Sequence, residues 1–280
     1  MKTHLLVRCT LAAVVAVPLA AATNDDPQYQ SKGLNKREYF LKEAGLKLPY
    51  SVFVPSTWAP GKHLPMVVVL HGGGSHHNTP FERGDGILAK EAEKNGFIIV
   101  SPEGGTGAYP GNGFGSDYAP VPANPSAAPP PTPKLSPEEL AKQRQISEAD
   151  TLAVIDRTKA EYGTEKARTY LMGNSMGMLG ALYLAQKYPE RWCAIGPSDG
   201  PTVPSSYPYE RIKKLTGAMF VHGDNDTIAL LDATREIADN FKKAGVDTRF
   251  LVVKGGTHND SWAMALGETF DFYNQHRCGK

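Results

Sequence analysis

A serine flanked by glycines is the residue of this sequence best suited to covalent chemistry. Ser175 lies in Gly173-Asn174-Ser175-Met176-Gly177, which matches the G-x-S-x-G pattern of a nucleophile elbow. In that elbow a sharp strand-to-helix turn exposes the hydroxyl, and glycines are needed because strand and helix approach too closely for a Cβ atom. A strand pattern over 167–172 precedes the motif and a helix pattern over 178–187 follows it. We therefore predict that Ser175 is a nucleophile and not an ordinary surface serine.

A serine hydroxyl attacks well only when a base removes its proton and a third group orients that base. Among the eight histidines, His258 follows the last predicted strand in a glycine-rich loop that can carry an imidazole over the edge of a sheet. Asp226 follows another strand and is the predicted orienting acid, because it lies further past the strand end than Asp224. Asp224 remains an alternative, as the acid or as a turn-capping residue. The chain order Ser175, Asp226, His258 is the order expected when such an elbow carries the nucleophile, and it differs from the orders used by two other folds with the same three residue types.

A second glycine-rich loop, Leu70–Gly74, follows a buried strand. Glycines there allow backbone N–H groups to approach a developing oxyanion, and such donors stabilise the tetrahedral intermediate of acyl transfer. We predict one donor at Gly73 and the other at Met176, with Gly74 as the alternative to Gly73. The neighbouring histidines at 71, 76 and 77 could bind a metal in principle. No Asp, Glu or Cys completes a recognisable ligand spacing, so we predict no metal site there.

Short β-rich runs alternate with longer helical patterns, which predicts a mostly parallel sheet with helices on both faces. The eight predicted strands are Glu38–Leu41, Lys47–Val54, Pro65–His71, Phe97–Ser101, Arg168–Met172, Cys193–Gly196, Ala218–His222 and Thr248–Val253. The predicted helices are Ile87–Lys94, Ser147–Tyr162 with Asp150 as a capping partner, Met176–Lys187, Leu231–Ala244 and Trp262–Gln275. The polar segment 24–35 is expected to be poorly ordered.

The predicted fold class is therefore α/β, with one domain over 23–280. Runs at 66–70 and 97–100 are continuously apolar, as expected for strands covered on both faces. The Pro- and Gly-rich stretch at about 103–137 is predicted to be an insertion within that domain, because strands on either side of it belong to one sheet. Trp262 is a candidate substrate contact, since it lies four residues after His258.

The amino terminus has the pattern of a signal peptide over 1–22. Lys2 and Arg8 precede an apolar run over 11–19 and three alanines at 20–22. The run is shorter than the roughly 20 residues of a membrane anchor, so we expect export to the medium or periplasm, with a bacterial source. Cleavage would remove these two basic residues, leaving 28 basic against 29 acidic residues and changing the formal charge from +1 to −1. Neither nucleic acid nor a membrane surface is therefore an expected partner.

Export would also determine which cysteines the mature chain keeps and whether they can form a disulfide. Cys9 leaves with the leader, and Cys193 and Cys278 remain as the only cysteines of the mature chain. An oxidising compartment would allow them to form a disulfide. The sequence leaves this pairing open because it does not show how close the two Cα atoms lie.

The motifs together resemble those of the α/β-hydrolase superfamily, and within it secreted esterases grouped with polyhydroxybutyrate depolymerases, feruloyl esterases and prolyl-oligopeptidase-like hydrolases. The segments that carry the resemblance are Leu48–Pro55, Leu70–Gly74, Tyr170–Gly177, His222–Asp226 and Gly255–His258. The resemblance implies hydrolysis of a small or polymeric ester through an acyl-serine intermediate, without a cofactor. Asn174 departs from it, because many relatives have histidine at that position.

Two other functions compete with ester hydrolysis. The likeness to prolyl oligopeptidases suggests peptide-bond cleavage, although the sequence contains no propeller domain that would select oligopeptides. A hydrolase fold retained only for binding is the second alternative, but such a protein would be expected to lose its triad, and here all three positions are filled. The sequence gives neither the acyl group, the alcohol nor the oligomeric state.

Overall fold

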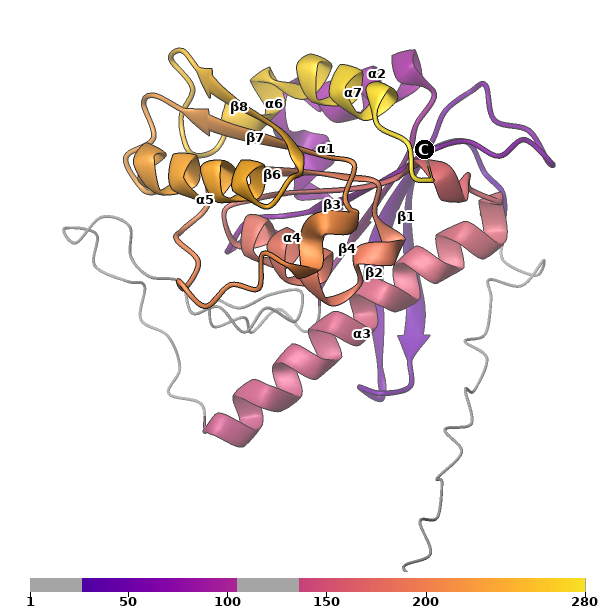
Figure 1. Ribbon diagram of the computed structural model, residues 1–280. Helices are drawn as coiled ribbons and strands as arrows, with labels where there is room; N and C mark the ends of the chain where they lie inside the picture. Colours follow the sequence, from indigo (N-terminus) through magenta and orange to yellow (C-terminus); the bar gives the residue numbers. More distant parts are fainter. Residues whose placement is uncertain (1–26, 105–135, 280) are drawn as a thin grey trace, which may run out of the picture.

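The computed structural model describes residues 27–104 and 136–279 (Figure 1). The predicted signal peptide over 1–22 lies outside the described residues, as does nearly all of the insertion predicted at about 103–137. No helix among the described residues is long and apolar enough to cross a membrane.

One eight-stranded sheet forms the centre of the molecule, in the order β1-β2-β4-β3-β5-β6-β7-β8. The strands are β1 (Gly33–Leu41), β2 (Leu46–Val54), β3 (Met66–Leu70), β4 (Ile98–Pro102), β5 (Thr169–Asn174), β6 (Ala194–Ser198), β7 (Gly217–Gly223) and β8 (Asp247–Val253). β2 runs antiparallel to β1 and to β4, and every other neighbouring pair is parallel. All eight predicted strands, and the mostly parallel sheet, are confirmed.

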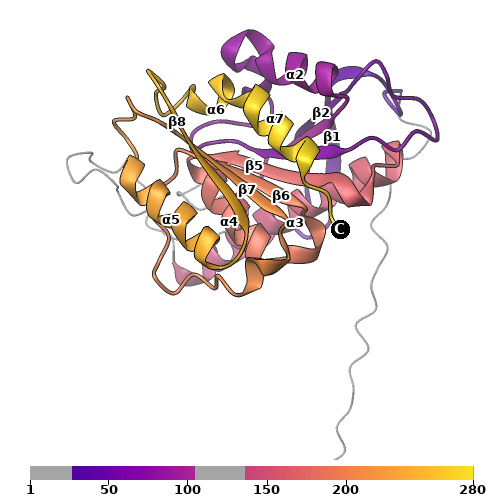
Figure 2. The ribbon, with the colours of Figure 1, turned by 45° about the horizontal axis from the view of Figure 1, so that its top comes forward.

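Helices cover both faces of the sheet and enclose a separate apolar core on each (Figures 1 and 2). The helices are α1 (Thr79–Glu82), α2 (Ile87–Asn95), α3 (Pro137–Tyr162), α4 (Met176–Lys187), α5 (Leu231–Lys243), α6 (Ser261–Met264) and α7 (Leu266–Gln275). Val154, Leu182 and Phe241 bring α3, α4 and α5 onto one face. Leu88 and Phe270 bring α2 and α7 onto the other. Burial on both faces explains the continuously apolar strands.

The amino-terminal tail is more ordered than the sequence predicts. β1 already begins at Gly33, and Asn35 pairs with Val52 of β2. The Asn35 side chain is buried and donates to the carbonyls of Ser31 and Gly33 at 3.2 and 3.0 Å. These local hydrogen bonds satisfy a polar side chain that, in the sequence, resembles part of a solvated tail.

The start predicted for the helix at 147 is wrong, because α3 begins ten residues earlier. Ser136 is its N-cap and forms a capping box with Glu139. Asp150 is buried inside the helix, where its carboxylate accepts hydrogen bonds from the Tyr39 hydroxyl and from the N–H of Gly104, both at 2.6 Å. The helix predicted over 262–275 is also interrupted, since α6 and α7 are separated at Ala265.

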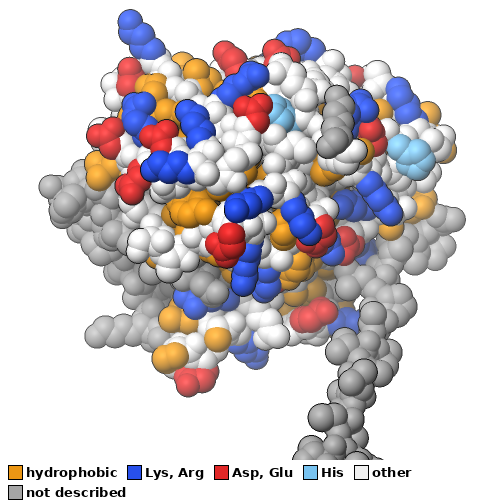
Figure 3. All heavy atoms as spheres, viewed as in Figure 1, with side chains coloured by type: hydrophobic (Ala, Val, Ile, Leu, Met, Phe, Trp, Pro, Cys, Tyr) orange, Lys and Arg blue, Asp and Glu red, His pale blue; other side chains and the backbone are white. Residues whose placement is uncertain are grey.

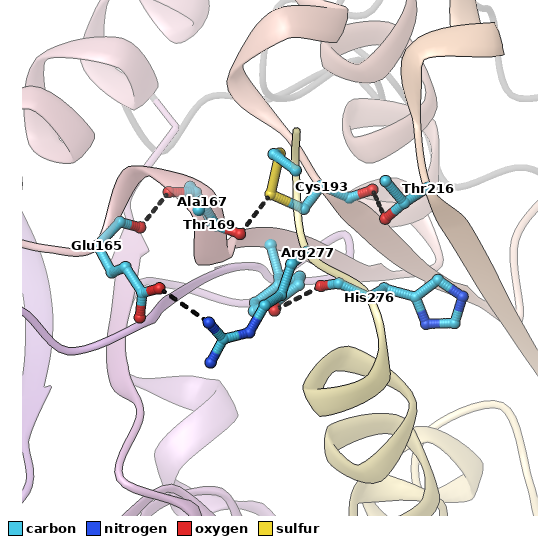
Figure 4. The surroundings of a disulfide bond; sticks show 9 residues. Glu165, Ala167, Thr169, Cys193, Thr216, His276 and Arg277 are labelled. Carbon is cyan, nitrogen blue, oxygen red and sulfur yellow. Dashed lines mark hydrogen bonds and ion pairs between the residues drawn. A yellow bond between two sulfur atoms is a disulfide. The ribbon is translucent and has the colours of Figure 1, made fainter. Parts of the chain in front are cut away.

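A disulfide joins Cys193, just before β6, to Cys278 near the carboxyl terminus (Figure 4). The two Cα atoms lie 4.8 Å apart, and both backbone N–H groups bond to the segment that leads into β5. Cys278 donates to the carbonyl of Ala167 at 3.0 Å and Cys193 to that of Thr169 at 2.8 Å. The bond therefore fastens the chain end beyond α7 to the middle of the sheet.

Charged side chains of both signs are interspersed on the face of the molecule shown in Figure 3. This mixture agrees with a formal charge of only +1 for the whole chain. A surface of this kind creates no strong field of one sign over that face.

Replacing both Cys193 and Cys278 by serine should lower the free energy of unfolding. The disulfide closes a loop of 85 residues, so the entropy of the unfolded chain alone predicts a loss of about 4 to 5 kcal/mol. Denaturant titration of the oxidised protein and of the double variant measures the difference. The expected control result is that reductant destabilises only the wild type, and an equal response of both proteins would contradict the prediction.

Candidate active site

The register of the parallel strands brings the predicted site residues to one edge of the sheet. Leu70 of β3 pairs with Gly173 of β5, and Asn174 pairs with Ser198 of β6. Gly223 of β7 pairs with Val253 of β8. Every loop that carries a predicted site residue therefore leaves the sheet at the same carboxyl edge, which is where ligands bind in open α/β sheets.

Ser175 occupies the strained turn that the motif predicts. Its backbone has φ 57° and ψ −117°, and its N–H donates to the carbonyl of Ser198 at 2.9 Å. A Cβ atom on Gly173 would lie 2.1 Å from the carbonyl oxygen of Gly177, and one on Gly177 would lie 2.1 Å from that of Leu70. Both glycines are needed because backbone atoms occupy the space that a side chain would fill.

The structure brings Ser175, His258 and Asp226 together. The Nε2 atom of His258 lies 2.9 Å from the Ser175 hydroxyl, and its Nδ1 atom lies 2.8 Å from a carboxylate oxygen of Asp226. A carboxylate accepts hydrogen bonds, so Nδ1 carries the proton and Nε2 is free to accept one from the hydroxyl. The His258 side chain is 10% exposed and the Asp226 carboxylate is fully buried. A substrate would therefore reach these three side chains from the Ser175 side.

The loop after β7 fixes the Asp226 carboxylate on its other side. Oδ1 accepts hydrogen bonds from the N–H groups of Ile228 and Ala229, at 2.7 and 2.9 Å. Burial raises the pKa of Asp226, but the hydrogen bonds from His258 and from these two N–H groups outweigh it and leave the pKa below its ordinary value. Asp226 is therefore ionised at neutral pH.

Asp224, the alternative acid, points to a different partner. Its Oδ1 atom accepts a hydrogen bond from the N–H of Gly255 at 2.6 Å, and the residue is exposed. This geometry fits the turn-capping role that the sequence left open for it.

A second buried carboxylate, Asp199, lies directly behind these residues. It follows β6, has φ 46° and is 0% exposed. It accepts hydrogen bonds from the N–H of Gly223 at 2.9 Å, from the Asn174 amide at 3.3 Å and from the Ser261 hydroxyl. Asp199 thus connects β5, β7 and α6.

Asn174 extends these connections to the histidine loop. Its amide nitrogen also donates to the carbonyl of His258, at 3.1 Å. The sequence marked Asn174 only as a departure from the histidine that many relatives have at this position, and it singled out neither Asp199 nor Ser261. The available signal was an aspartate three residues after the predicted strand Cys193–Gly196, between Ser198 and Gly200.

The environments of the two buried carboxylates push their pKa values in opposite directions. Burial raises the pKa of Asp199 to about 7, although hydrogen bonds from Ser261 and Gly223 lower it, and the neighbouring Asp226 contributes to the increase. Asp199 therefore exchanges its proton near neutral pH, whereas Asp226 remains charged.

The predicted oxyanion loop lies against the start of α4. A Cβ atom built on Gly72 would lie 3.5 Å from the Cβ of Ser175, and one on Gly73 would lie 4.0 Å from that of Met176. Met176 is the first residue of α4, so its N–H has no acceptor within the helix. Gly74, the alternative donor, has φ 71°, a conformation that by itself favours glycine.

Trp262 and the three histidines near the oxyanion loop have partners inside the protein. Trp262 is 5% exposed and donates to the carbonyl of Asn259 at 3.1 Å, so it has little surface to offer to a substrate. It lines a pocket together with Gly72 and Asn174. His71 Nε2 lies 3.0 Å from the carbonyl of Glu103, His76 Nδ1 accepts from the N–H of Asn78 at 3.2 Å, and His77 Nδ1 lies 2.8 Å from the Ser51 hydroxyl.

Within residues 27–104 and 136–279, one group has the composition of a metal site. It comprises Asp199, His222 and Asp226, whose possible ligand atoms all lie within 4.8 Å of one another. Both carboxylates already accept the hydrogen bonds described above. A cation at this position would compete with those donors for the carboxylate oxygens.

Replacing Asp199 by Asn should change how stability depends on pH. The folded pKa of about 7 exceeds the ordinary value of 3.8, so the folded protein holds this proton more tightly than the unfolded chain. The wild type should therefore lose up to about 4 kcal/mol of unfolding free energy through this group as pH rises from about 4 to above 7. Denaturant titrations at several pH values should show a smaller decline for Asp199→Asn. Parallel curves for the two proteins would show that Asp199 carries no such shift.

Comparisons with known proteins agree with this architecture. The Esterase family, described as "Putative esterase", matches residues 42–273. A bifunctional acetylxylan esterase/xylanase of Neocallimastix patriciarum is 24% identical over 203 residues, which are 72% of this chain. The match spans only 25% of that larger protein.

Solved structures show the same fold at low sequence identity. A thermostable esterase has a TM-score of 0.63 and 22% identity, over 87% of this chain and 63% of that one. A ferulic acid esterase from Anaeromyces mucronatus has a TM-score of 0.61 and 20% identity, over 92% of this chain and 96% of that one. The α/β-hydrolase fold predicted from the motifs is confirmed. Because the family match spans most of the sequence, the chain belongs to the Esterase family.

Proposed function

We propose that this protein hydrolyses carboxylic esters through an acyl intermediate on Ser175, with His258 as the base and Asp226 as the orienting acid. The observation that carries the proposal is the continuous contact from the Ser175 hydroxyl to His258 at 2.9 Å and from His258 to Asp226 at 2.8 Å. The strained elbow at Ser175 supports it, because backbone strain of this kind often accompanies function.

In the proposed acylation, Ser175 Oγ attacks the acyl carbon while His258 Nε2 takes its proton. The carbonyl oxygen becomes an oxyanion that the N–H groups of Gly73 and Met176 stabilise. The ester C–O bond then breaks, and His258 returns the proton to the departing alkoxide. Water repeats the sequence on the acyl-serine and releases the carboxylic acid. Asp226 keeps the proton on Nδ1 of His258 and stabilises the imidazolium.

We further propose acetyl and feruloyl esters as the substrates to examine first. The relatives described above are named as an acetylxylan esterase and a ferulic acid esterase. The leader that the sequence predicts over 1–22 would direct export, and the disulfide between Cys193 and Cys278 suits an oxidising compartment. Matched ester and anilide substrates separate an esterase from a peptidase, because an esterase leaves the anilide intact.

Replacing Ser175 by Ala should abolish turnover while leaving the fold intact. The proposed mechanism predicts a loss in kcat of at least about 10³-fold on acetyl and feruloyl esters, since no other group forms the acyl intermediate. A fluorophosphonate probe should label the wild type and not the variant. Unchanged ester turnover in the purified variant, or failure of the probe to label an active wild type, would overturn the proposal.

The two aspartates after β7 provide a matched pair. Asp226→Asn should lower kcat by about 10³- to 10⁴-fold, because an amide no longer favours the His258 tautomer with its proton on Nδ1. Asp224→Asn, two residues away on the exposed turn, should change kcat by about twofold or less. Steady-state kinetics of both variants measures the contrast, and the reverse ranking would make Asp224 the acid.

A further inference from the structure

The side chain of Asn174 lies between the loop that carries the proposed base and the loop that carries the predicted oxyanion donors. Its amide nitrogen donates to the carbonyl of His258 at 3.1 Å and to a carboxylate oxygen of Asp199 at 3.3 Å. Its Oδ1 atom faces the oxyanion loop, because a Cβ atom built on Gly72 would lie 3.4 Å from it. The proposed acyl transfer gives Asn174 no part in the chemistry, so these contacts need another explanation.

The two partners of the Asn174 amide determine which way it faces. A backbone carbonyl and an ionised carboxylate accept hydrogen bonds and cannot donate them, whereas an amide NH₂ group supplies two hydrogens. Turning the amide over would place its oxygen against two acceptors, which is repulsive in a site of low dielectric constant. The nitrogen therefore faces His258 and Asp199, and each of its hydrogens has a partner.

Asp199 is a fixed point to which this amide is tied. It is 0% exposed, and its carboxylate also accepts hydrogen bonds from the N–H of Gly223 in β7 and from the hydroxyl of Ser261, the first residue of α6. Ser261 is itself fully buried. Because three donors from different elements meet at this one carboxylate, it cannot rotate or move without leaving at least one buried donor unsatisfied.

The loop that carries His258 needs a contact of this kind. It joins β8 to α6 and contains Gly255 and Gly256, and glycine leaves a chain free to adopt many conformations. The imidazole must nevertheless keep Nε2 at 2.9 Å from the Ser175 hydroxyl. A hydrogen bond to the carbonyl of His258 fixes the peptide plane next to the Cα atom that bears the ring, and so restricts where the ring can lie.

We propose that Asn174 is a positioning residue, whose amide ties the carbonyl of His258 to the buried carboxylate of Asp199 and thereby keeps Nε2 within reach of the Ser175 hydroxyl. The inference rests on the proposed triad, in which His258 is the base. Asn174 and Ser175 are consecutive, so one strand-to-helix turn both presents the nucleophile and holds the loop of the group that activates it. Their relative position is then set over a short path through the chain and not through the whole sheet.

Two substitutions that remove the amide test the proposal. Asn174→Leu keeps a side chain of similar shape and Asn174→Ala leaves the space open, but neither can donate to His258. Both should lower kcat by about 10- to 100-fold, the loss expected when a catalytic group is displaced by up to about 1 Å. KM should change by about twofold or less, because the base acts in the transition state and not in substrate binding. Wild-type kcat on acetyl and feruloyl esters in either folded variant would overturn the proposal.

Ser198 supplies a matched control from the same end of the sheet. Its buried hydroxyl donates to the carbonyl of Gly173 at 3.3 Å, so Ser198→Ala removes a hydrogen bond next to the elbow that does not involve His258. This variant should keep kcat within about threefold of the wild type, even where its thermal unfolding midpoint falls. A loss of kcat as large as that of Asn174→Leu would show that any hydrogen bond removed at the elbow has this effect, and would overturn the proposal.

Asp199→Asn tests whether the carboxylate acts through Asn174. The variant offers one acceptor oxygen in place of two, so it cannot satisfy all three donors. It should lower kcat in the wild-type background and lower it by a smaller factor when Asn174→Leu is already present, because residues that share a contact are not additive. Equal factors in the two backgrounds would show that Asp199 does not hold the base through Asn174.

A spectroscopic measurement needs no turnover. The proton between Nδ1 of His258 and the buried carboxylate of Asp226 should give a far-downfield ¹H resonance, assigned by its loss in His258→Ala. The resonance should broaden or disappear in Asn174→Leu, because a ring that no longer keeps its place exchanges this proton with water, and it should persist in Ser198→Ala. An unchanged resonance in folded Asn174→Leu would overturn the inference. Failure of the proposed function is recognised separately, by an active Ser175→Ala variant.

Discussion

The site depends on backbone contacts so close that only glycine fits them. α4 lies against the end of β3 at Gly177, where a Cβ atom would be 2.1 Å from the carbonyl oxygen of Leu70. That contact places Ser175 beside the glycine loop that follows β3. A similar approach occurs at Gly223, where a Cβ atom would be 2.2 Å from the carbonyl oxygen of Gly256. The first contact brings the nucleophile to the predicted oxyanion donors, and the second brings the acid loop to the histidine loop.

Polar groups then fix the orientation that these contacts allow. Asn174 is the residue just before the nucleophile, and its amide donates both to Asp199 and to the carbonyl of His258. Asp199 in turn holds the N–H of Gly223, three residues before Asp226. The elements that carry the serine, the acid and the histidine are thus linked behind the site, away from the substrate. A displacement of one of these loops would leave buried polar groups of the others unsatisfied, at a cost of about 1 to 3 kcal/mol for each group.

The sequence allowed accurate prediction wherever the signal was local. Continuous apolar runs predicted β3 and β4, and the elbow motif predicted both the turn at Ser175 and the first residue of α4. Asp226 and His258 were predicted because each follows a strand, and the structure places His258 against Ser175 and Asp226 against His258. The start of α3 was missed because its buried positions begin only at 147, while the preceding turns are mostly solvated and give no periodic signal.

Residues whose role depends on several distant partners could not be predicted in this way. Asp199 acquires its role from positions 174, 223 and 261, and no spacing in the sequence relates these four. The pairing of Cys193 with Cys278 likewise depends on a Cα separation that only the folded sheet sets.

Asp199 and Asp226 show what the hydrogen bonds between distant residues contribute to the site. Two ionised carboxylates this close repel each other, so one is expected to hold a proton more readily than the other. Asp226 has the stronger donors, namely His258 and two backbone N–H groups, and its pKa is lowered. For Asp199 the effect of burial dominates, and it raises the pKa to about 7. Because the difference is set by the donors that each carboxylate meets, the negative charge is concentrated on the one that faces His258, where an imidazolium would form.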